Sequence, residues 1–360
     1  MHSSTSNFDF QRVIPDLPWR QLVWTAALIT AVATVAWEIR ARSLGYVPTL
    51  NDTPDLWAQE RAKVKPDSLV IVGDSRALFD SDLDAIEHGL GQRPVQLALV
   101  GSCAYPILAD LVADEKFHGT VIVGLIPGLW LVPQGAPVNN SLTALKRYRS
   151  QTLAQRASHQ LGMLLEDRIA FLQQEDLTLK QLLLRLPIAN RPNALVPPRL
   201  PPYFYTLEHD RRARMFEPAA HPGPLQERIK SGWIPLFTPP PPPSFVPRDV
   251  FLKGVGAAIE QRFKDTADAV HKLRARGGKV VFVRFPNTGE LKKLEDMATP
   301  RQGPWDRIIK ESGAPGIYYS DYPELAGFDC PEWSHLSAAD SVEFTKRLVP
   351  HLKAALGHKD

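Results

Sequence analysis

Two stretches, far apart in the chain, hold residue types that suit nucleophilic catalysis. Ser75 closes a Gly-Asp-Ser sequence after the apolar run 69–72, and Glu332 lies three residues before His335. A serine hydroxyl becomes a good nucleophile only when a neutral imidazole accepts its proton, and that imidazole needs an acceptor on its other nitrogen. Serine, histidine and an acid are therefore the set that attack on an ester requires. Taken alone, Gly-Asp-Ser is also a common turn and helix cap.

The elements around these residues indicate a sheet edge. The run 69–72 is typical of a buried parallel strand, and open α/β sheets bind ligands beyond the carboxyl ends of their strands. Ser337 and Asp340 form a helix-start signature, which places His335 just ahead of a final amphipathic helix. Strands alternating with helices predict βαβ units and a mainly parallel five-stranded sheet, with the other strands at 95–100, 120–126, 280–285 and 317–320 and with helices at 80–90 and 105–116.

A serine after the first strand, with an acid and a histidine just before the last helix, resembles the SGNH/GDSL hydrolase family. The resemblance covers roughly residues 68–355, interrupted by a long insertion. It implies that Ser75 is the nucleophile, His335 the general base and Glu332 the orienting acid. It also implies an oxyanion hole made by the backbone amides of Ser75 and Gly101, because Gly101 follows the second strand as the family's second-block glycine does.

The chain departs from the family pattern at two places. The family has an asparagine after the third strand, whereas this strand runs into Pro127, and Asn139 and Asn140 lie further downstream. The family acid is usually aspartate, and Asp329 is a second candidate beside Glu332. The departures concern catalysis rather than fold, and the implied fold is α/β, a flavodoxin-like three-layer αβα arrangement.

The resemblance implies a serine esterase or O-acyltransferase that acts through an acyl-enzyme on acyl esters, preferably acetyl esters, of cell-envelope carbohydrate. It implies no cofactor. Some anchored members work beside membrane-bound acyltransferases, so the expected partners are an acylated carbohydrate and such an acyltransferase. The departures favour an alternative, a catalytically silent domain that binds glycan or scaffolds an envelope assembly. A third reading is an adaptor that acts through the proline run 239–243.

Three further residues are candidates for special roles. Arg284, near the end of the fourth strand, could contact an anionic or sugar substrate or form a structural ion pair. Cys103 and Cys330 lie in loops that the predicted fold brings to one sheet edge, so a Cys103–Cys330 disulfide would fit and would imply an oxidising compartment. Two unpaired buried cysteines are the alternative. The ten histidines show no ligand spacing, so no metal is expected.

A 17-residue run without charge, 21–37, has tryptophans near its ends and reaches the lower length limit for a membrane span. We predict a single-pass anchor; a cleaved signal peptide or a buried helix are the alternatives. Arginines flank both ends, so charge does not set the orientation. Together with the resemblance, the run predicts a protein of the bacterial inner membrane with its catalytic domain in the periplasm. The 42 basic and 39 acidic residues are scattered, which gives no case for nucleic acid.

The predicted organisation is a tail (1–20), the anchor (21–37), a polar connector (45–65) and a domain in two parts (66–138 and 249–360) around a helical and proline-rich insertion (139–248). No strand is predicted in the insertion. About half of the 33 prolines fall between Pro187 and Pro247, which predicts extended chain with aromatic residues that pack down in places. Apolar residues at helical spacing are expected to pack on the domain rather than on lipid: Leu153, Leu161, Leu164, Leu165, Ile169 and Leu172.

Overall fold

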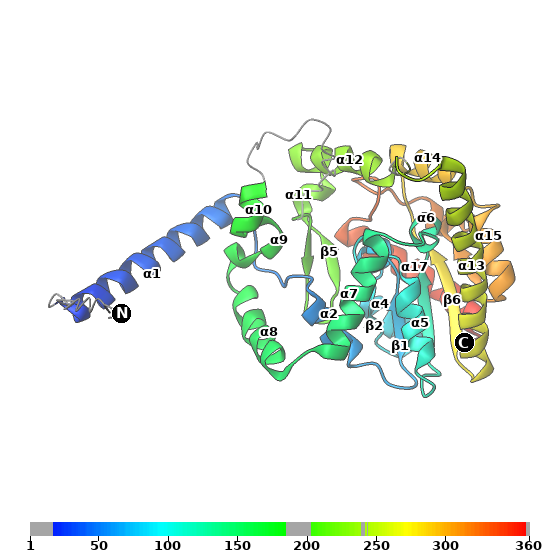
Figure 1. Cartoon of the computed structure of the whole chain (residues 1–360), viewed down its shortest axis with the longest axis horizontal. Helices are drawn as coiled ribbons and strands as arrows, with labels where there is room; N and C mark the ends of the chain where they lie inside the picture. Colours follow the sequence, from blue (N-terminus) through cyan, green and yellow to red (C-terminus); the bar gives the residue numbers. More distant parts are fainter. Residues whose placement is uncertain (1–16, 185–202, 239–241, 243, 358–360) are drawn as a thin grey trace, which may run out of the picture.

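A computed structural model of the chain describes residues 17–184, 203–238, 242 and 244–357. One long N-terminal helix, α1 (Trp19–Ser43), projects from an α/β domain (Figure 1). This helix is long and apolar enough to cross a membrane, and none of its apolar stretch is buried against the protein. The predicted proline run 239–243 lies outside the described residues except for Pro242, as do residues 187–202.

Five strands form one sheet in the order β2-β1-β3-β6-β7, and every neighbouring pair is parallel. The α/β class and the parallel five-stranded sheet are therefore confirmed. The regular pairing of β2 ends early, although the amides of Leu97 and Leu99 still donate to the carbonyls of Ile71 and Gly73 at 2.8 and 3.1 Å. The strands are β1 (Leu69–Val72), β2 (Val95–Gln96), β3 (Thr120–Gly124), β6 (Lys279–Arg284) and β7 (Gly316–Tyr318).

Successive strand residues point to opposite faces of the sheet and enter two hydrophobic clusters. Ile71 and Ile122 belong to the first cluster, and Val70 and Val121 belong to the second. Because both clusters are covered by helices, the strands are apolar throughout rather than alternating. The first cluster includes residues of α3 (Ser75–Phe79), α4 (Leu83–Leu90) and α17 (Ala338–Leu356); the second includes residues of α5 (Tyr105–Ala113), α13 (Arg248–Ala275) and α15 (Pro304–Ser312).

Helix starts follow the capping chemistry of the sequence. The Ser337 hydroxyl accepts a hydrogen bond from the Asp340 amide at 3.1 Å, which confirms the predicted start of α17. The helix predicted over 80–90 is α4, which begins at Leu83, and a short helix that was not predicted, α3, precedes it from Ser75. Asp82 then caps α4 by accepting from the Ala85 amide at 2.9 Å.

The predicted polar connector 45–65 is partly wrong, because it contains a buried helix, α2 (Pro54–Arg61). Leu56 and Trp57 are fully buried, and the Trp57 indole donates to the Leu97 carbonyl at 3.0 Å. Two apolar residues among polar ones make no periodic pattern, so only the folded domain reveals that this segment belongs to the core.

The insertion departs most from prediction. Two strands that were not predicted, β4 (Tyr205–Leu207) and β5 (Ala213–Met215), form an antiparallel pair. Their three residues each are too short to give a periodic signal. The helices described between β3 and α13 are α6 (Pro127–Trp130), α7 (Ala136–Ser150), α8 (Leu153–Glu166), the 3-10 helix η1 (Ala170–Leu172), α9 (Gln174–Leu177), α10 (Leu179–Leu184), α11 (Glu217–Ala220) and α12 (Pro224–Phe237).

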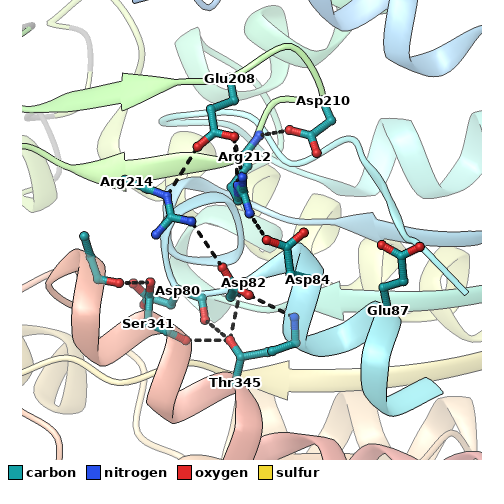
Figure 2. Close-up of polar contacts among 12 residues, drawn as sticks. Asp80, Asp82, Asp84, Glu87, Glu208, Asp210, Arg212, Arg214, Ser341 and Thr345 are labelled. Carbon is teal, nitrogen blue, oxygen red and sulfur yellow. Dashed lines mark hydrogen bonds and ion pairs between the residues drawn. The ribbon is translucent and has the colours of Figure 1, made fainter. Parts of the chain in front are cut away.

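Charged contacts dock the β4–β5 pair on the domain. Figure 2 shows Arg212 and Arg214 reaching Asp84 and Asp82 at the start of α4. The amide of Asp82 in turn donates to Thr345 of α17 at 2.9 Å, so the insertion, α4 and α17 form one polar network. The remaining elements are α14 (Gly289–Ala298), η2 (Tyr319–Asp321) and α16 (Pro323–Ala326).

The predicted packing of the insertion's leucines was wrong. Leu161, Leu164 and Leu165 of α8 are 65, 55 and 52 % exposed, whereas Met163 and Glu166 are the buried residues of this helix. These leucines of α8 therefore face outward, while Met163 of the same helix packs in the first hydrophobic cluster.

Candidate active site

Strand β1 delivers Ser75 to the carboxyl end of the sheet. Ser75 is 8 % exposed and begins α3, whose N-cap Asp74 accepts from the Arg76 amide at 2.9 Å. A Cβ atom at Gly73 would lie 2.4 Å from the Cβ of Ala77, so only glycine allows α3 to pack this closely on the strand. The Gly-Asp-Ser turn therefore has a structural role as well as the proposed catalytic one.

Glu332 and His335 form a buried pair. The Glu332 Oε1 atom lies 2.9 Å from His335 Nδ1 and accepts from the His335 amide at 2.5 Å, and both side chains are fully buried. The carboxylate places the imidazole proton on Nδ1, which leaves the lone pair on Nε2. Nε2 is buried and has no hydrogen-bond partner among the described residues. Asp329, the second candidate for the acid, is exposed.

The insertion supplies aromatic residues to this pair. Trp233 of α12 donates its indole N–H to Glu332 Oε2 at 2.6 Å and to the Glu332 carbonyl at 2.7 Å. The imidazole stacks on Phe79 with 4.4 Å between ring centroids, and Phe204 and Trp233 lie 5.8 and 5.6 Å away. Sequence reasoning missed these contacts, because Trp233 lies 99 residues from Glu332 and the two phenylalanines lie still further away in the chain. The only signal was the density of aromatic residues in the proline-rich insertion.

The loop that carries His335 runs along α3. Arg76 Nε donates to the Ser334 carbonyl at 3.1 Å, and Asp80 Oδ1 accepts from the Leu336 amide at 2.9 Å. Phe79 lies one helical turn after Ser75, so the two side chains project from the same side of α3. The structure therefore brings the imidazole to the helix that begins at Ser75. It records no hydrogen bond between Ser75 and His335.

Residues around the Glu332–His335 pair include a buried carboxyl group and a strained backbone position. Burial raises the pKa of Asp80 well above its usual range. Trp333, between Glu332 and His335, has a φ of 79°, which is unusual for a bulky residue. Its turn is held by hydrogen bonds from the Trp333 amide to the Cys330 carbonyl and from the Thr288 amide to the Trp333 carbonyl, at 2.8 and 3.0 Å.

Arg284 forms a buried ion pair, which is one of the two roles predicted for it. It is 3 % exposed and forms an ion pair with Glu295, which also pairs with Arg76 and accepts from Asn287 Nδ2 at 3.1 Å. Burial alone would raise the pKa of Glu295, but the attraction of the two guanidinium groups outweighs it and holds this pKa at about 2. Because Arg76 also holds the Ser334 carbonyl, the network fixes the His335 loop to α3.

The Glu295 network predicts a loss of stability in acid. The folded pKa of Glu295, about 2, lies below its ordinary value of 4.5, so its contribution is present above pH 4.5 and is lost as the pH falls through 2. This 2.5-unit difference corresponds to about 3 kcal/mol. We expect the difference in unfolding free energy between wild type and Glu295→Gln to shrink by that order from pH 5 to pH 2. A difference that stays constant over this range would show that folding does not lower the pKa of Glu295.

Gly101 follows β2, as predicted. It is exposed and has a φ of +59°. Its carbonyl accepts from Asn140 Nδ2 at 3.2 Å. Helix α7 approaches the same loop through the Cys103 amide, which donates to the Pro137 carbonyl at 3.0 Å. Asn140 thus contacts Gly101 although the two residues are 39 positions apart in the chain. Sequence spacing did not predict this contact.

The predicted Cys103–Cys330 disulfide is not formed, and both residues are free, buried thiols. Cys103 Sγ lies 3.4 Å from the Trp130 carbonyl, while Cys330 packs in the first hydrophobic cluster. Burial raises the pKa of both thiols, which makes them poor nucleophiles. The cysteines therefore give no support for an oxidising compartment. Within the described ranges, no group of three or more His, Cys, Asp or Glu residues is arranged to hold a metal ion.

Comparison of the chain with protein-family models, with curated proteins and with solved structures finds no match. The site must therefore be interpreted from its own geometry.

Proposed function

We propose that the protein is a membrane-anchored, SGNH-like serine esterase or O-acyltransferase, with acyl esters of cell-envelope carbohydrate, preferably acetyl esters, as substrates. The observation that carries the proposal is the Glu332–His335 pair, whose Nε2 is left without a partner among the described residues beside the helix that Ser75 begins. A buried imidazole oriented through Nδ1 is the arrangement that a general base requires. The strand order, in which the first strand lies between the second and third, supports a flavodoxin-like three-layer fold with Ser75 at its carboxyl edge.

In the proposed reaction, Ser75 Oγ attacks the ester carbonyl carbon while His335 Nε2 takes its proton. Glu332 stabilises the imidazolium that forms, and the backbone amides of Ser75 and Gly101 donate to the oxyanion. Collapse of the tetrahedral intermediate expels the alcohol, which receives the proton from His335, and leaves an acyl-enzyme. Water or a sugar hydroxyl then attacks the acyl group with His335 again as base. Attack by water releases a free acid, and attack by a sugar hydroxyl forms a new ester.

This chemistry requires two changes in the structure. The Ser75 hydroxyl must come within hydrogen-bond reach of Nε2, a bond that often tightens only when substrate binds. Phe204 and Trp233 must also uncover the imidazole, because they pack beside it from the insertion. The insertion therefore acts as a cover over the site in this proposal.

The burial of His335 favours a second candidate, a catalytically silent SGNH-like scaffold or glycan-binding protein. The imidazole is fully buried among aromatic rings and makes no hydrogen bond to Ser75. Two surface hollows of about 540 and 620 Å³ lie beside the insertion, and neither is lined by Ser75 or His335. In this candidate the Glu332–His335 pair joins the last loop to α3 and α12 without taking part in a reaction.

For the location, we propose a single-pass protein of the bacterial inner membrane with its α/β domain in the periplasm. Helix α1, with an apolar stretch that nothing in the described structure covers, supports the span. A membrane-bound acyltransferase is the proposed partner, since it could supply the acyl group on the same surface. The proposed orientation in the membrane rests on the family resemblance, because the charges that flank the span do not determine it.

A fluorophosphonate probe tests the proposed function on the full chain in detergent. This reagent forms a stable adduct only with a serine that a general base activates. We expect one adduct, located on Ser75 by peptide mass spectrometry, and a loss of labelling of at least tenfold in His335→Ala. Ser341→Ala is the matched control, because Ser341 is also buried but lies in α17 and donates to the Ala338 carbonyl. A folded wild type that takes up no probe would favour the silent scaffold.

A further inference from the structure

Six leucines of the insertion form an exposed apolar surface, here called the leucine patch. They are between 49 and 82 % exposed: Leu153, Leu161, Leu164 and Leu165 of α8 and Leu179 and Leu183 of α10. The opposite side of α8 faces the domain, where Glu166 Oε2 accepts from the Asn51 amide at 3.0 Å. A helix that packs on a soluble domain usually turns its leucines inward, whereas the four leucines of α8 face outward. Exposed apolar surface of this kind marks a site of contact with a partner or a membrane.

The two helices that carry the leucine patch flank, in the chain, the segment that binds the C-terminal end of α1. The Glu38 carboxylate of α1 accepts from the amides of Ala170 and Phe171, each at 3.1 Å, and Arg42 Nη2 donates to the Arg168 carbonyl at 3.0 Å. Ala170 follows α8 by four residues. The segment from Arg168 to Phe171, which lies between α8 and α10 in the chain, thus holds the C-terminal end of α1. Figure 1 shows α8, α9 and α10 on the side of the domain from which α1 leaves.

The same contacts determine where the leucine patch lies relative to the bilayer that α1 would cross. The uncharged stretch of α1 ends at Trp37, and Glu38, Arg40 and Arg42 follow it. When α1 crosses a membrane, a tryptophan and charges at this point lie among the lipid headgroups. The segment bound to Glu38 and Arg42 must then lie at headgroup level too, and α8 and α10 adjoin that segment in the chain.

From this continuity we infer that the leucine patch inserts into the interface of the same bilayer that α1 crosses. Its helices resemble interfacial amphipathic helices, whose apolar side enters the boundary between headgroups and acyl chains. The exposed arginines Arg40, Arg156 and Arg168 border the patch and suit anionic headgroups. A second attachment beside the anchor would stop the domain from rotating freely, and so would fix the direction in which its sheet edge faces. The inference takes α1 as a span but does not depend on the chemistry of Ser75.

Fluorescence from a single labelled position tests the inference in the full chain, reconstituted at one chain per lipid nanodisc. We would label Leu161→Cys with an environment-sensitive fluorophore; the unsubstituted chain measures background from the buried Cys103 and Cys330. Met297→Cys is the matched control, because Met297 is 75 % exposed on α14. We expect lipids with a quencher near the headgroup to quench position 161 at least twofold more than position 297. Aqueous iodide should show the opposite preference.

Each other outcome overturns the inference. Iodide quenching at 161 equal to that at 297, without lipid quenching, would place the leucine patch in water. Protection from both quenchers would mean that protein covers the patch, and one chain per disc excludes a second copy. A third label at Ala33→Cys reports on α1, and absence of lipid quenching there would show that α1 does not span. Because ester turnover is not measured, these results cannot be confused with failure of the proposed function.

Discussion

Alanine at Ser75 or at His335 is expected to lower ester turnover by about 10³-fold or more. Ser75→Ala removes the atom that forms the acyl-enzyme, and His335→Ala removes the base that activates it. Because the two residues act in one step, the double variant should be little slower than either single variant. The measurement is hydrolysis of p-nitrophenyl acetate by the full chain in detergent.

A buried serine outside the site provides the control for this prediction. Ser341→Ala should keep wild-type turnover, since its hydroxyl contacts only the backbone of α17. Turnover by wild type that is no faster than that of the alanine variants would exclude esterase activity on this substrate. The silent scaffold would then be the leading interpretation, unless a glycan acceptor revealed a transfer that depends on Ser75.

We expect Glu295→Ala to reduce the free energy of unfolding by about 3–5 kcal/mol, because it leaves buried charges without their partner. Arg76 and Arg284 both pair with Glu295, and all three side chains are 5 % exposed or less. Since Arg76 also holds the Ser334 carbonyl, loss of Glu295 should loosen the loop that carries His335. Urea unfolding followed by tryptophan fluorescence measures the change.

An exposed ion pair is the comparison for Glu295. Glu343 and Arg347 of α17 are 48 and 45 % exposed and form an i,i+4 pair. Because such pairs contribute little in water, Glu343→Ala should cost well under 1 kcal/mol. Equal effects of the two substitutions would contradict a special role for the buried network.

Several features were predictable because their signals are local. Buried parallel strands need continuous apolar runs, so β1, β3 and β6 were recognisable from a few residues each. The hydroxyl of Ser337 and the amide of Asp340 lie three residues apart, so the start of α17 was also visible. The family resemblance, carried by residues close in sequence, implied the pairing of Glu332 with His335, and the structure places these two side chains 2.9 Å apart.

Contacts between distant segments were not predictable in this way. The indole of Trp233 reaches Glu332 across 99 residues, and Asn140 reaches Gly101 across 39. No periodicity or motif encodes such pairs, since they depend on how the insertion folds back over the sheet. The disulfide prediction failed for a related reason: the position of two loops at one edge does not determine where their side chains point.

The sequence by itself determined the alternation of strands and helices, the apolar helix α1 and the residue types of the candidate site, since each depends on neighbours within a few residues. Only the tertiary structure decided that α2 is buried, that the leucines of α8 face outward and that aromatic residues of the insertion close over His335. The physical reason is that the burial of a residue depends on its contacts with segments that are distant in the chain. A leucine at helical spacing predicts an apolar side on a helix, but the packing of the folded protein decides which way that side turns.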